Sequence, residues 1–254
     1  MFEKLDLDGG GHLAFVHRAG VTPGVMFCGG FKSDMTGSKA LALEALCGAR
    51  RQAFTRFDYR GHGYSSGVFK DGTISAWLKD TLTIIDRVTA GSLILVGSSM
   101  GAWIAALAAL ARPERVKGLV GIAAAPDFTE DLIWGRATAA ERRMLRETGF
   151  LERPSAYGED PYLITRRLIE DGREHLLLRG PIAIHCPVHL LHGQNDPDVP
   201  WQTTLRFAER LSTDDVNVEL IKAGDHRLST PLQIERIWAG IQRVRTMIGG
   251  KSAA

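Results

Sequence analysis

Cysteine is scarce in this sequence, and the few thiols present are not spaced as pairs. The 254 residues include only Cys28, Cys47 and Cys186, with no C-x-x-C motif. An odd number of isolated cysteines does not build a disulfide framework and is typical of a reducing compartment. The sequence therefore excludes a small scaffold that depends on disulfide bonds.

Long apolar runs are missing as well. The longest apolar stretch covers residues 102–111, whereas a helix that crosses a bilayer needs about 20 residues. The first residues, MFEKLD, lack the apolar segment of a signal peptide and the Arg-rich character of a transit peptide. We therefore expect a cytoplasmic protein that is not integral to a membrane.

An excess of either charge is also absent. The chain has 31 lysine and arginine residues against 29 aspartate and glutamate residues, which gives a net charge of +2. A near balance gives no electrostatic reason to expect a nucleic acid or an anionic membrane as partner. Hydrophobic residues make up 44% of the chain, which suffices for a packed globular core.

Short apolar runs alternate with helical patterns through most of the chain. After a glycine turn that suits a hairpin, the runs typical of strands are residues 12–18, 25–28, 52–58, 93–97, 118–123, 188–192 and 216–221. The segments with a helical pattern are residues 39–46, 74–85, 102–111, 201–211 and 231–248. This alternation predicts an α/β fold with a parallel sheet and right-handed crossovers.

Residues 127–180 interrupt the alternation. The stretch contains no clear strand, and residues 138–147 and 161–170 have a charged, helical pattern. We expect a helical cap insertion at 127–180 within a core formed by 1–126 and 181–254, because ordered insertions of this length are usually functional. Its aromatic residues either line a substrate pocket or fill the insertion's own core, and they are Phe128, Trp134, Phe150, Tyr157 and Tyr162.

The strongest local motif is Gly97-Ser98-Ser99-Met100-Gly101. It fits G-x-S-x-G between an apolar strand and a helix, which is the context that a nucleophile elbow requires. Such a turn is sharp, so the residues two before and two after the nucleophile must be small. Ser99 would then stand at the carboxyl edge of the sheet, where open α/β sheets bind ligands. We predict Ser99 as a nucleophile, against the alternative of a plain Gly/Ser turn.

A serine hydroxyl reacts only when a base takes its proton and an acid orients that base. In this type of fold the chain order is Ser, then Asp or Glu, then His. His226 is the only one of eight histidines that follows the last expected strand, so we predict it as the base. Asp196 and Asp198 compete for the acid. We favour Asp196, because Asp198 is placed to cap the helix that follows.

Acyl transfer also needs N–H donors aimed at the developing oxyanion. The backbone N–H of Met100, directly after the nucleophile, is one expected donor. The other should come from the loop Cys28-Gly29-Gly30-Phe31, whose glycines let the backbone pass close to a substrate. We assign this second donor to Phe31.

Three histidines close together, His185, His189 and His192, raise the alternative of a metal site. Their spacing would suit one face of a helix, but Pro187 interrupts a helix there and the pattern is that of a strand. On a strand, His189 and His192 point to opposite faces. We therefore expect neither a metal nor another cofactor.

The segment 58–65, DYRGHGYS, is a further motif. Its glycine and serine residues are typical of a tight loop. We expect Asp58 and Arg60 to hold the turns of this loop together without taking part in chemistry.

Taken together, these residues resemble the α/β-hydrolase family. Within that family the chain is similar, over almost its full length, to the mitochondrial palmitoyl-protein thioesterases that also hydrolyse mycophenolic acid acyl-glucuronide. The segments that carry the likeness are GSKAL (37–41), FDY (57–59), LVGSS (95–99), ARPE (111–114), LLHG (190–193), VPW (199–201), LSTD (211–214) and DHR (225–227).

The resemblance implies an α/β-hydrolase fold with a mostly parallel eight-stranded sheet and a helical cap. It implies a catalytic triad of Ser99, Asp196 and His226, the same residues that the chain order indicates. It also implies small-molecule esters or thioesters as substrates, with an acylated protein as a further candidate.

Two other interpretations stay open. The same scaffold supports lactonases, amidases and C–C bond hydrolases, and a non-enzymatic ligand receptor would keep the triad as a binding site. The sequence does not distinguish a fatty thioester from an acyl-glucuronide or a short-chain ester as substrate. It does not indicate an oligomeric state.

Overall fold

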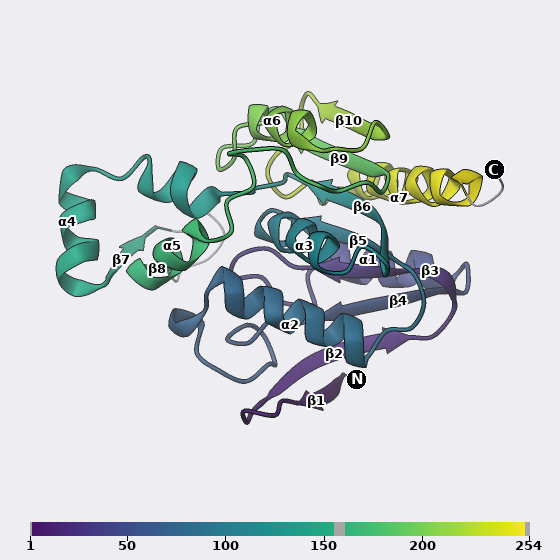
Figure 1. The fold of residues 1–254 in the computed structure, drawn as a ribbon, viewed down its shortest axis with the longest axis horizontal. Helices are drawn as coiled ribbons and strands as arrows, with labels where there is room; N and C mark the ends of the chain where they lie inside the picture. Colours follow the sequence, from purple (N-terminus) through teal and green to yellow (C-terminus); the bar gives the residue numbers. More distant parts are fainter. Residues whose placement is uncertain (1, 155–160, 252–254) are drawn as a thin grey trace.

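The computed structural model describes residues 2–154 and 161–251, and its centre is one large β-sheet (Figure 1). Within these residues the sheet has eight strands. In spatial order they are β1 (Glu3–Asp6), β2 (His12–Arg18), β4 (Gln52–Phe57), β3 (Val21–Cys28), β5 (Leu93–Ser98), β6 (Val116–Ile122), β9 (Val188–Gly193) and β10 (Val216–Ile221). β2 is antiparallel to β1 and β4, and the remaining neighbours are parallel. The predicted mostly parallel sheet is confirmed, and β1 is an addition whose exposed residues gave no apolar pattern.

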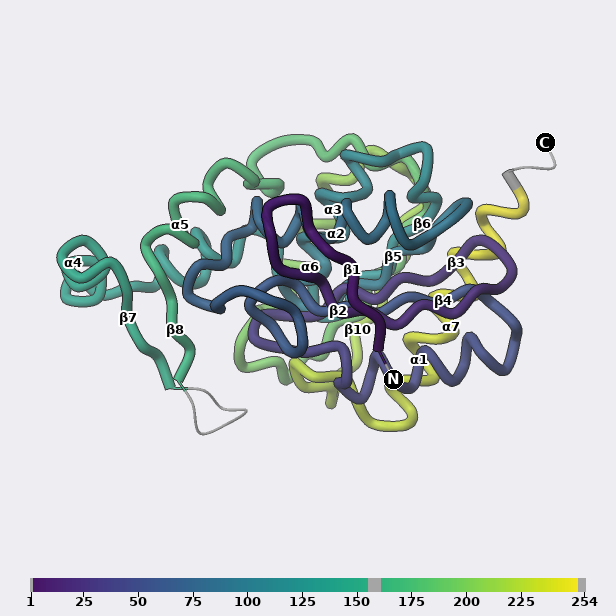
Figure 2. The backbone as a smooth tube through the Cα atoms, turned by 90° about the horizontal axis from the view of Figure 1, so that it is seen from below, coloured from purple at the N-terminus to yellow at the C-terminus, as the bar shows by residue number. Residues whose placement is uncertain are grey.

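Helices cover both faces of this sheet. α1 (Ser38–Gly48) and α7 (Pro231–Lys251) lie together on one face, and α2 (Ile74–Arg87) and α3 (Met100–Ala111) lie together on the other (Figure 2). α6 (Gln202–Arg210) packs against β9 and β10, and the 3₁₀ turn η1 (Phe69–Asp71) precedes α2. α3 is buried along most of its length, as its run of alanine and other apolar residues predicts.

The parallel strands end at a common edge. β3, β5, β9 and β10 run in the same direction, so the loops that follow them meet beyond their carboxyl ends. These loops begin at residues 29, 99, 194 and 222. The topology therefore brings together the segments in which the sequence places its candidate active-site residues.

Between β6 and β9 the chain leaves the sheet and forms a protruding segment (Figures 1 and 2). Its elements are the π-helical turn η2 (Thr129–Trp134), α4 (Ala139–Thr148), β7 (Phe150–Arg153), β8 (Tyr162–Thr165) and α5 (Arg166–Arg173). The expectation that this segment contains no strand is wrong, whereas the helix expected at 138–147 is present as α4. β7 and β8 pair as an antiparallel ribbon, and residues 162–165, expected in a helix, form β8.

The cause of this difference is local. The side chains of β8 are aromatic, aliphatic or β-branched, which favours a paired strand. The hydroxyl of Thr165 then accepts the Leu168 N–H at 3.1 Å and caps α5, so the helix begins only after Thr165.

Asp127 joins the two ends of the protruding segment. Its side chain is fully buried, and its carboxylate accepts the N–H groups of Leu177 and Leu178 at 2.7 and 2.9 Å. The Arg179 guanidinium lies 3.6 Å from the same carboxylate. The beginning and the end of the segment are therefore tied to each other.

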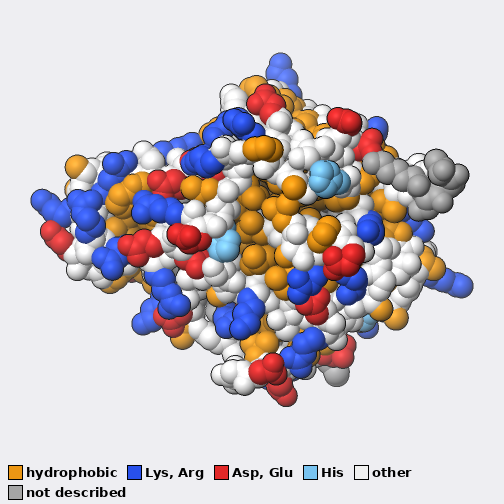
Figure 3. Space-filling model, in the orientation of Figure 1, with side chains coloured by type: hydrophobic (Ala, Val, Ile, Leu, Met, Phe, Trp, Pro, Cys, Tyr) orange, Lys and Arg blue, Asp and Glu red, His pale blue; other side chains and the backbone are white. Residues whose placement is uncertain are grey.

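Charges of both signs are mixed on the surface. On the face drawn in Figure 3, basic and acidic side chains alternate over the protruding segment, without a continuous patch of one sign. In the described ranges, no helix combines the length and the apolar character needed to cross a membrane.

Candidate active site

Ser99 stands at a sharp turn between β5 and α3. Its backbone has φ +56° and ψ −120°, a conformation that is strained for a residue with a side chain and is typical of functional sites. A Cβ atom at Gly97 would lie 2.3 Å from the carbonyl oxygen of Gly101, and one at Gly101 would lie 2.1 Å from that of Cys28. Both glycines are therefore required by close backbone packing, which explains the G-x-S-x-G pattern.

His226 reaches this serine from the loop between β10 and α7. Its Nε2 lies 3.1 Å from the Ser99 hydroxyl oxygen, although 127 residues separate the two in the sequence. Its Nδ1 lies 2.7 Å from Oδ2 of Asp196. The structure thus brings together the three side chains predicted from the sequence, in the order hydroxyl, imidazole, carboxylate.

Asp196 is held by donors on both carboxylate oxygens. Oδ1 accepts the backbone N–H groups of Asp198 and Val199 at 2.8 and 2.9 Å, and Oδ2 faces His226 and His192. Burial alone would raise the pKa of this carboxyl, but the hydrogen bonds from the two histidines outweigh it and hold the pKa well below its usual range. The group is therefore ionised at neutral pH.

Asp198, the competing aspartate, has a different position. Its backbone N–H donates to Asp196, and its side chain borders the cavity described below. The expectation that it caps the following helix is wrong, because Trp201 is the N-terminal cap residue of α6.

The two expected oxyanion donors border the same space as Ser99. Neither the Phe31 N–H nor the Met100 N–H has a hydrogen-bond acceptor within residues 2–154 and 161–251. Gly30 brings the first of these segments close to the nucleophile, since a Cβ there would lie 3.5 Å from the Ser99 Cβ.

A cavity of about 640 Å³ opens in front of Ser99. One wall comes from the protruding segment, with the apolar residues Phe128, Leu132, Ile133, Tyr162 and Ile164 and the basic residues Arg136 and Arg153. Of the aromatic residues singled out from the sequence, Phe128 and Tyr162 border the cavity, while Trp134 and Phe150 do not. Tyr157 lies outside the described residues.

Comparison with known proteins identifies the family. A family model described as alpha/beta hydrolase fold matches residues 27–148. The mouse protein named "Palmitoyl-protein thioesterase ABHD10, mitochondrial" is 42% identical over 224 residues, which are 88% of this chain and 75% of that protein. The chain belongs to the α/β-hydrolase family.

Solved structures of other α/β-hydrolases agree with this assignment. A putative hydrolase from Agrobacterium vitis S4 is 41% identical with a TM-score of 0.91, over 96% of this chain and 99% of that chain. The alpha/beta hydrolase domain-containing protein 10 from mouse is 38% identical with a TM-score of 0.90, over 97% of this chain and 98% of that chain. The predicted fold class and the prediction that the chain is a hydrolase are confirmed.

The expectation of a cytoplasmic protein is wrong. The mammalian relatives of this α/β-hydrolase, including the mouse, bovine and human proteins, are named mitochondrial. The expectation depended on the isolated cysteines, the lack of a long apolar run and the character of the first residues, and none of these determines the compartment.

Asp196 and His226 of this α/β-hydrolase, which offer metal-binding atoms, are already engaged in hydrogen bonds. Ligand atoms of Asp196, Asp198 and His226 lie within 4.8 Å of one another, but N–H donors of the protein occupy both oxygens of Asp196. The histidines considered from the sequence point apart, because His189 faces α7 and His192 faces Asp196.

Sequence reasoning missed the role of His192. Its side chain is fully buried, its Nε2 lies 3.0 Å from Oδ2 of Asp196, and its Nδ1 lies 2.6 Å from the Thr204 hydroxyl. The tautomer that satisfies both contacts carries the proton on Nε2 and donates it to Asp196. The signal was the position of a histidine at the end of β9, four residues before the acid.

Lys39 was also missed. It borders the cavity, and its ammonium donates to the carbonyl oxygen of Arg227, directly after His226. Burial, and to a smaller extent the charge of Arg227, lower the pKa of Lys39 to about 8, while Asp225 opposes the shift. Lys39 therefore ties α1 to the loop that carries His226.

We predict that His192→Leu lowers the free energy of unfolding by about 2 kcal/mol, the usual contribution of a hydrogen bond to a charged group. The variant should also lower kcat by roughly tenfold, because Asp196 loses a donor that fixes its carboxylate. Urea unfolding at pH 7 and steady-state kinetics measure the two effects. His185→Leu, at an exposed position, is the matched control, and equal behaviour of the two variants would contradict the role assigned to His192.

Proposed function

We propose that this chain is a serine hydrolase that cleaves carboxylic esters or thioesters through a Ser99–His226–Asp196 triad. The observation that carries the proposal is the unbroken series of contacts from the Ser99 hydroxyl to His226 at 3.1 Å and from His226 to Asp196 at 2.7 Å. This series opens on a cavity large enough for a small-molecule ligand.

In the proposed mechanism, the Nδ1–H of His226 donates to the carboxylate of Asp196, and Nε2 keeps a free electron pair. As the Ser99 oxygen attacks the substrate carbonyl carbon, its proton passes to Nε2, and Asp196 stabilises the imidazolium. The tetrahedral intermediate collapses to the acyl-enzyme while the imidazolium gives its proton to the leaving alcohol or thiol. A water molecule then attacks the acyl carbonyl carbon and gives a proton to Nε2 of His226; the bond to the Ser99 oxygen breaks, that oxygen takes the proton back, and the carboxylic acid is released.

The oxyanion of each tetrahedral intermediate would be stabilised by the Phe31 and Met100 N–H groups. Both border the cavity and have no acceptor in the described parts of the chain, so they are free to receive the charge that develops on the carbonyl oxygen. Donors fixed before the reaction begins stabilise such charge more than water does.

The protruding segment, residues 127–180, is proposed to act as a cap that binds the acyl group. Its apolar side chains form part of one wall of the cavity, and apolar surface of that kind favours a hydrocarbon chain. The name of the mouse relative, a palmitoyl-protein thioesterase, agrees with an acyl substrate of this class.

A panel of esters and thioesters with acyl chains of increasing length tests this function. We expect kcat/KM to rise about fourfold for each added methylene, corresponding to about 0.8 kcal/mol of buried surface, until the apolar part of that wall is filled. Leu132→Ala should reduce the increase of kcat/KM with chain length. Leu232 is an exposed leucine on α7, and Leu232→Ala should leave that increase unchanged.

The same panel, extended by lactones, amides and substrates cleaved at a C–C bond, distinguishes an esterase or thioesterase from a lactonase, an amidase or a C–C bond hydrolase. Preference for one of these bond types would replace the ester or thioester assignment. Reaction of Ser99 with an activated ester without any turnover would indicate a ligand receptor.

A further inference from the structure

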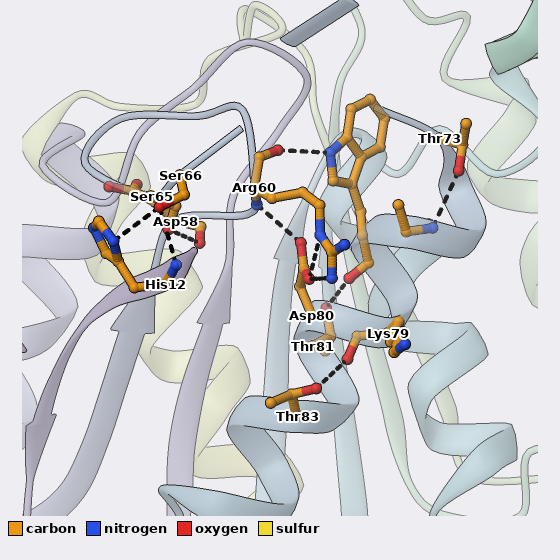
Figure 4. Close-up of polar contacts among 12 residues, drawn as sticks. His12, Asp58, Arg60, Ser65, Ser66, Thr73, Lys79, Asp80, Thr81 and Thr83 are labelled. Atoms are coloured by element: carbon orange, nitrogen blue, oxygen red, sulfur yellow. Dashed lines mark hydrogen bonds and ion pairs between the residues drawn. The ribbon is translucent and has the colours of Figure 1, made fainter. Parts of the chain in front are cut away.

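The segment 58–66, which follows β4, has no part in the proposed reaction, yet it is held firmly on α2. Asp80 of α2 is fully buried and accepts the Arg60 backbone N–H at 2.8 Å and its Nε and Nη2 at 2.9 and 2.6 Å (Figure 4). The indole N–H of Trp77 donates to the Arg60 carbonyl oxygen at 3.2 Å. Both guanidinium nitrogens contact Oδ1 and the backbone N–H contacts Oδ2, so the buried carboxylate fixes the backbone of Arg60 as well as its side chain.

The other end of the same segment is fixed on β2. The Ser65 and Ser66 hydroxyl oxygens accept the backbone N–H groups of Ala14 and His12 at 2.8 and 2.9 Å, and Figure 4 shows Ser65, Ser66 and His12 side by side. The segment is therefore a rigid support, anchored on a helix on one side and on a strand on the other.

From this support, contacts reach residues 29–35, the loop that contains the proposed oxyanion donor. The Tyr59 hydroxyl donates to the Gly29 carbonyl oxygen at 3.4 Å. The Lys32 N–H donates to Nε2 of His62 at 3.3 Å. The carboxylate of Asp58 accepts the Met35 N–H at 2.6 Å. The contacts thus fall at the beginning, the middle and the end of the oxyanion loop.

His62 makes the contact nearest to the proposed donor. Its side chain is only 4% exposed and packs against the rings of Tyr59, Phe69 and Trp77, with centroids 5.5, 5.1 and 5.2 Å away. Burial lowers the pKa of His62 to about 4, so the imidazole is neutral at pH 7. Its Nδ1 lies 3.5 Å from the Arg60 carbonyl oxygen, which leaves Nε2 as the acceptor for Lys32.

The backbone at Lys32, which donates to His62, has an unfavourable conformation that requires support from its neighbours. Lys32 has φ +58°, the left-handed region that residues with a Cβ atom disfavour. The ring of the preceding residue, Phe31, lies in the same aromatic cluster, 4.9 Å from Phe69 and 6.0 Å from Trp77. The peptide that joins Phe31 to Lys32 is therefore fixed by its ring on one side and by the imidazole on the other.

We propose that His62 is a positioning residue for the oxyanion contact: its imidazole accepts the Lys32 N–H and so keeps the Phe31 N–H directed at the carbonyl oxygen of a substrate on Ser99. The proposal rests on the proposed function, since it assigns His62 to the same reaction. His62 does not touch the substrate and exchanges no proton with it.

The test compares variants that keep or remove the acceptor. His62→Phe retains an aromatic ring but has no acceptor, and we expect kcat to fall between about tenfold and about a hundredfold with KM within about threefold, because loss of a complete oxyanion donor costs about 10² to 10³ in kcat. His62→Gln places an amide oxygen near the position of Nε2 and should recover kcat to within about threefold. His17→Phe, on β2 and hydrogen-bonded to Thr55, is the matched control and should behave as the wild type.

A second measurement separates positioning from general stability. An acyl trifluoromethyl ketone adds to Ser99 and places an oxyanion where the Phe31 and Met100 N–H groups act. Its inhibition constant should rise in His62→Phe by about the factor by which kcat falls, and it should recover in His62→Gln. If His62→Phe does not fold, His62→Asn replaces it. The asparagine amide would lie near the position of Nδ1 in the histidine, so the position of Nε2 would have no acceptor.

Wild-type kcat and ketone affinity in His62→Phe or His62→Asn would overturn the proposal. So would an equal loss of kcat in the Phe and Gln variants with unchanged ketone affinity, because that result indicates a structural role alone. Failure of the wild type to hydrolyse any ester or thioester would count against the proposed function, and the role of His62 would still be decided by the affinity for the ketone.

Discussion

Alanine in place of Ser99 is expected to lower ester or thioester turnover by about 10⁴-fold or more, with little change in KM. The residue provides the oxygen that attacks the carbonyl, and His226 has no other hydroxyl within 3.1 Å among the hydrogen bonds of the described residues. Removing the nucleophile of a triad costs nearly as much as removing the whole triad. Steady-state kinetics with an activated ester, together with covalent labelling by a fluorophosphonate, measures both consequences.

Ser98 provides the matched control for this experiment. It is the neighbouring serine of the same motif, but it belongs to β5 and is buried. Ser98→Ala should keep the fluorophosphonate label and turnover within a few-fold of the wild type. Labelling of Ser99→Ala to the same extent as the wild type would refute the assignment of the nucleophile.

The position of Ser99 could be predicted because its signal is local. A strand, a sharp turn and a helix need small residues at fixed offsets, and the close packing of Gly97 and Gly101 against neighbouring backbone shows why. The positions of Asp196 and His226 could be predicted for a different reason. In a parallel sheet, the loops that follow β9 and β10 lie at the same edge as the turn that follows β5.

The contacts that support these residues could not be predicted in the same way. His192 is hydrogen-bonded to Asp196 through a turn, and a turn produces no periodic pattern in the sequence. Lys39 is hydrogen-bonded to the loop of His226, 188 residues away in the sequence. Their partners are set by tertiary packing alone. The strands β7 and β8, four residues each, were likewise too short to show an alternating pattern, and they are stabilised by pairing with each other and by the burial of Leu151 and Ile164.

Asparagine in place of Asp196 is expected to lower kcat by about 10⁴-fold while the fold and the substrate affinity are kept. The backbone N–H groups of Asp198 and Val199 donate to Oδ1, so they should hold the amide oxygen of the new side chain on their side. The amide nitrogen then faces Nδ1 of His226 and can only donate to it. The proton of the imidazole moves to Nε2, where it blocks transfer from Ser99.

Asp198→Asn is the control that matches this change in charge and size, two residues away in the same loop. Because Nδ1 of His226 is hydrogen-bonded to Asp196, the turnover of Asp198→Asn should stay within a few-fold of the wild type. Kinetics of both variants at pH 7, with a thermal melt to show that each is folded, decides between the two aspartates. If Asp198→Asn were the inactive variant and Asp196→Asn the active one, the acid would lie at residue 198, and the 2.7 Å contact between Asp196 and His226 would be structural only.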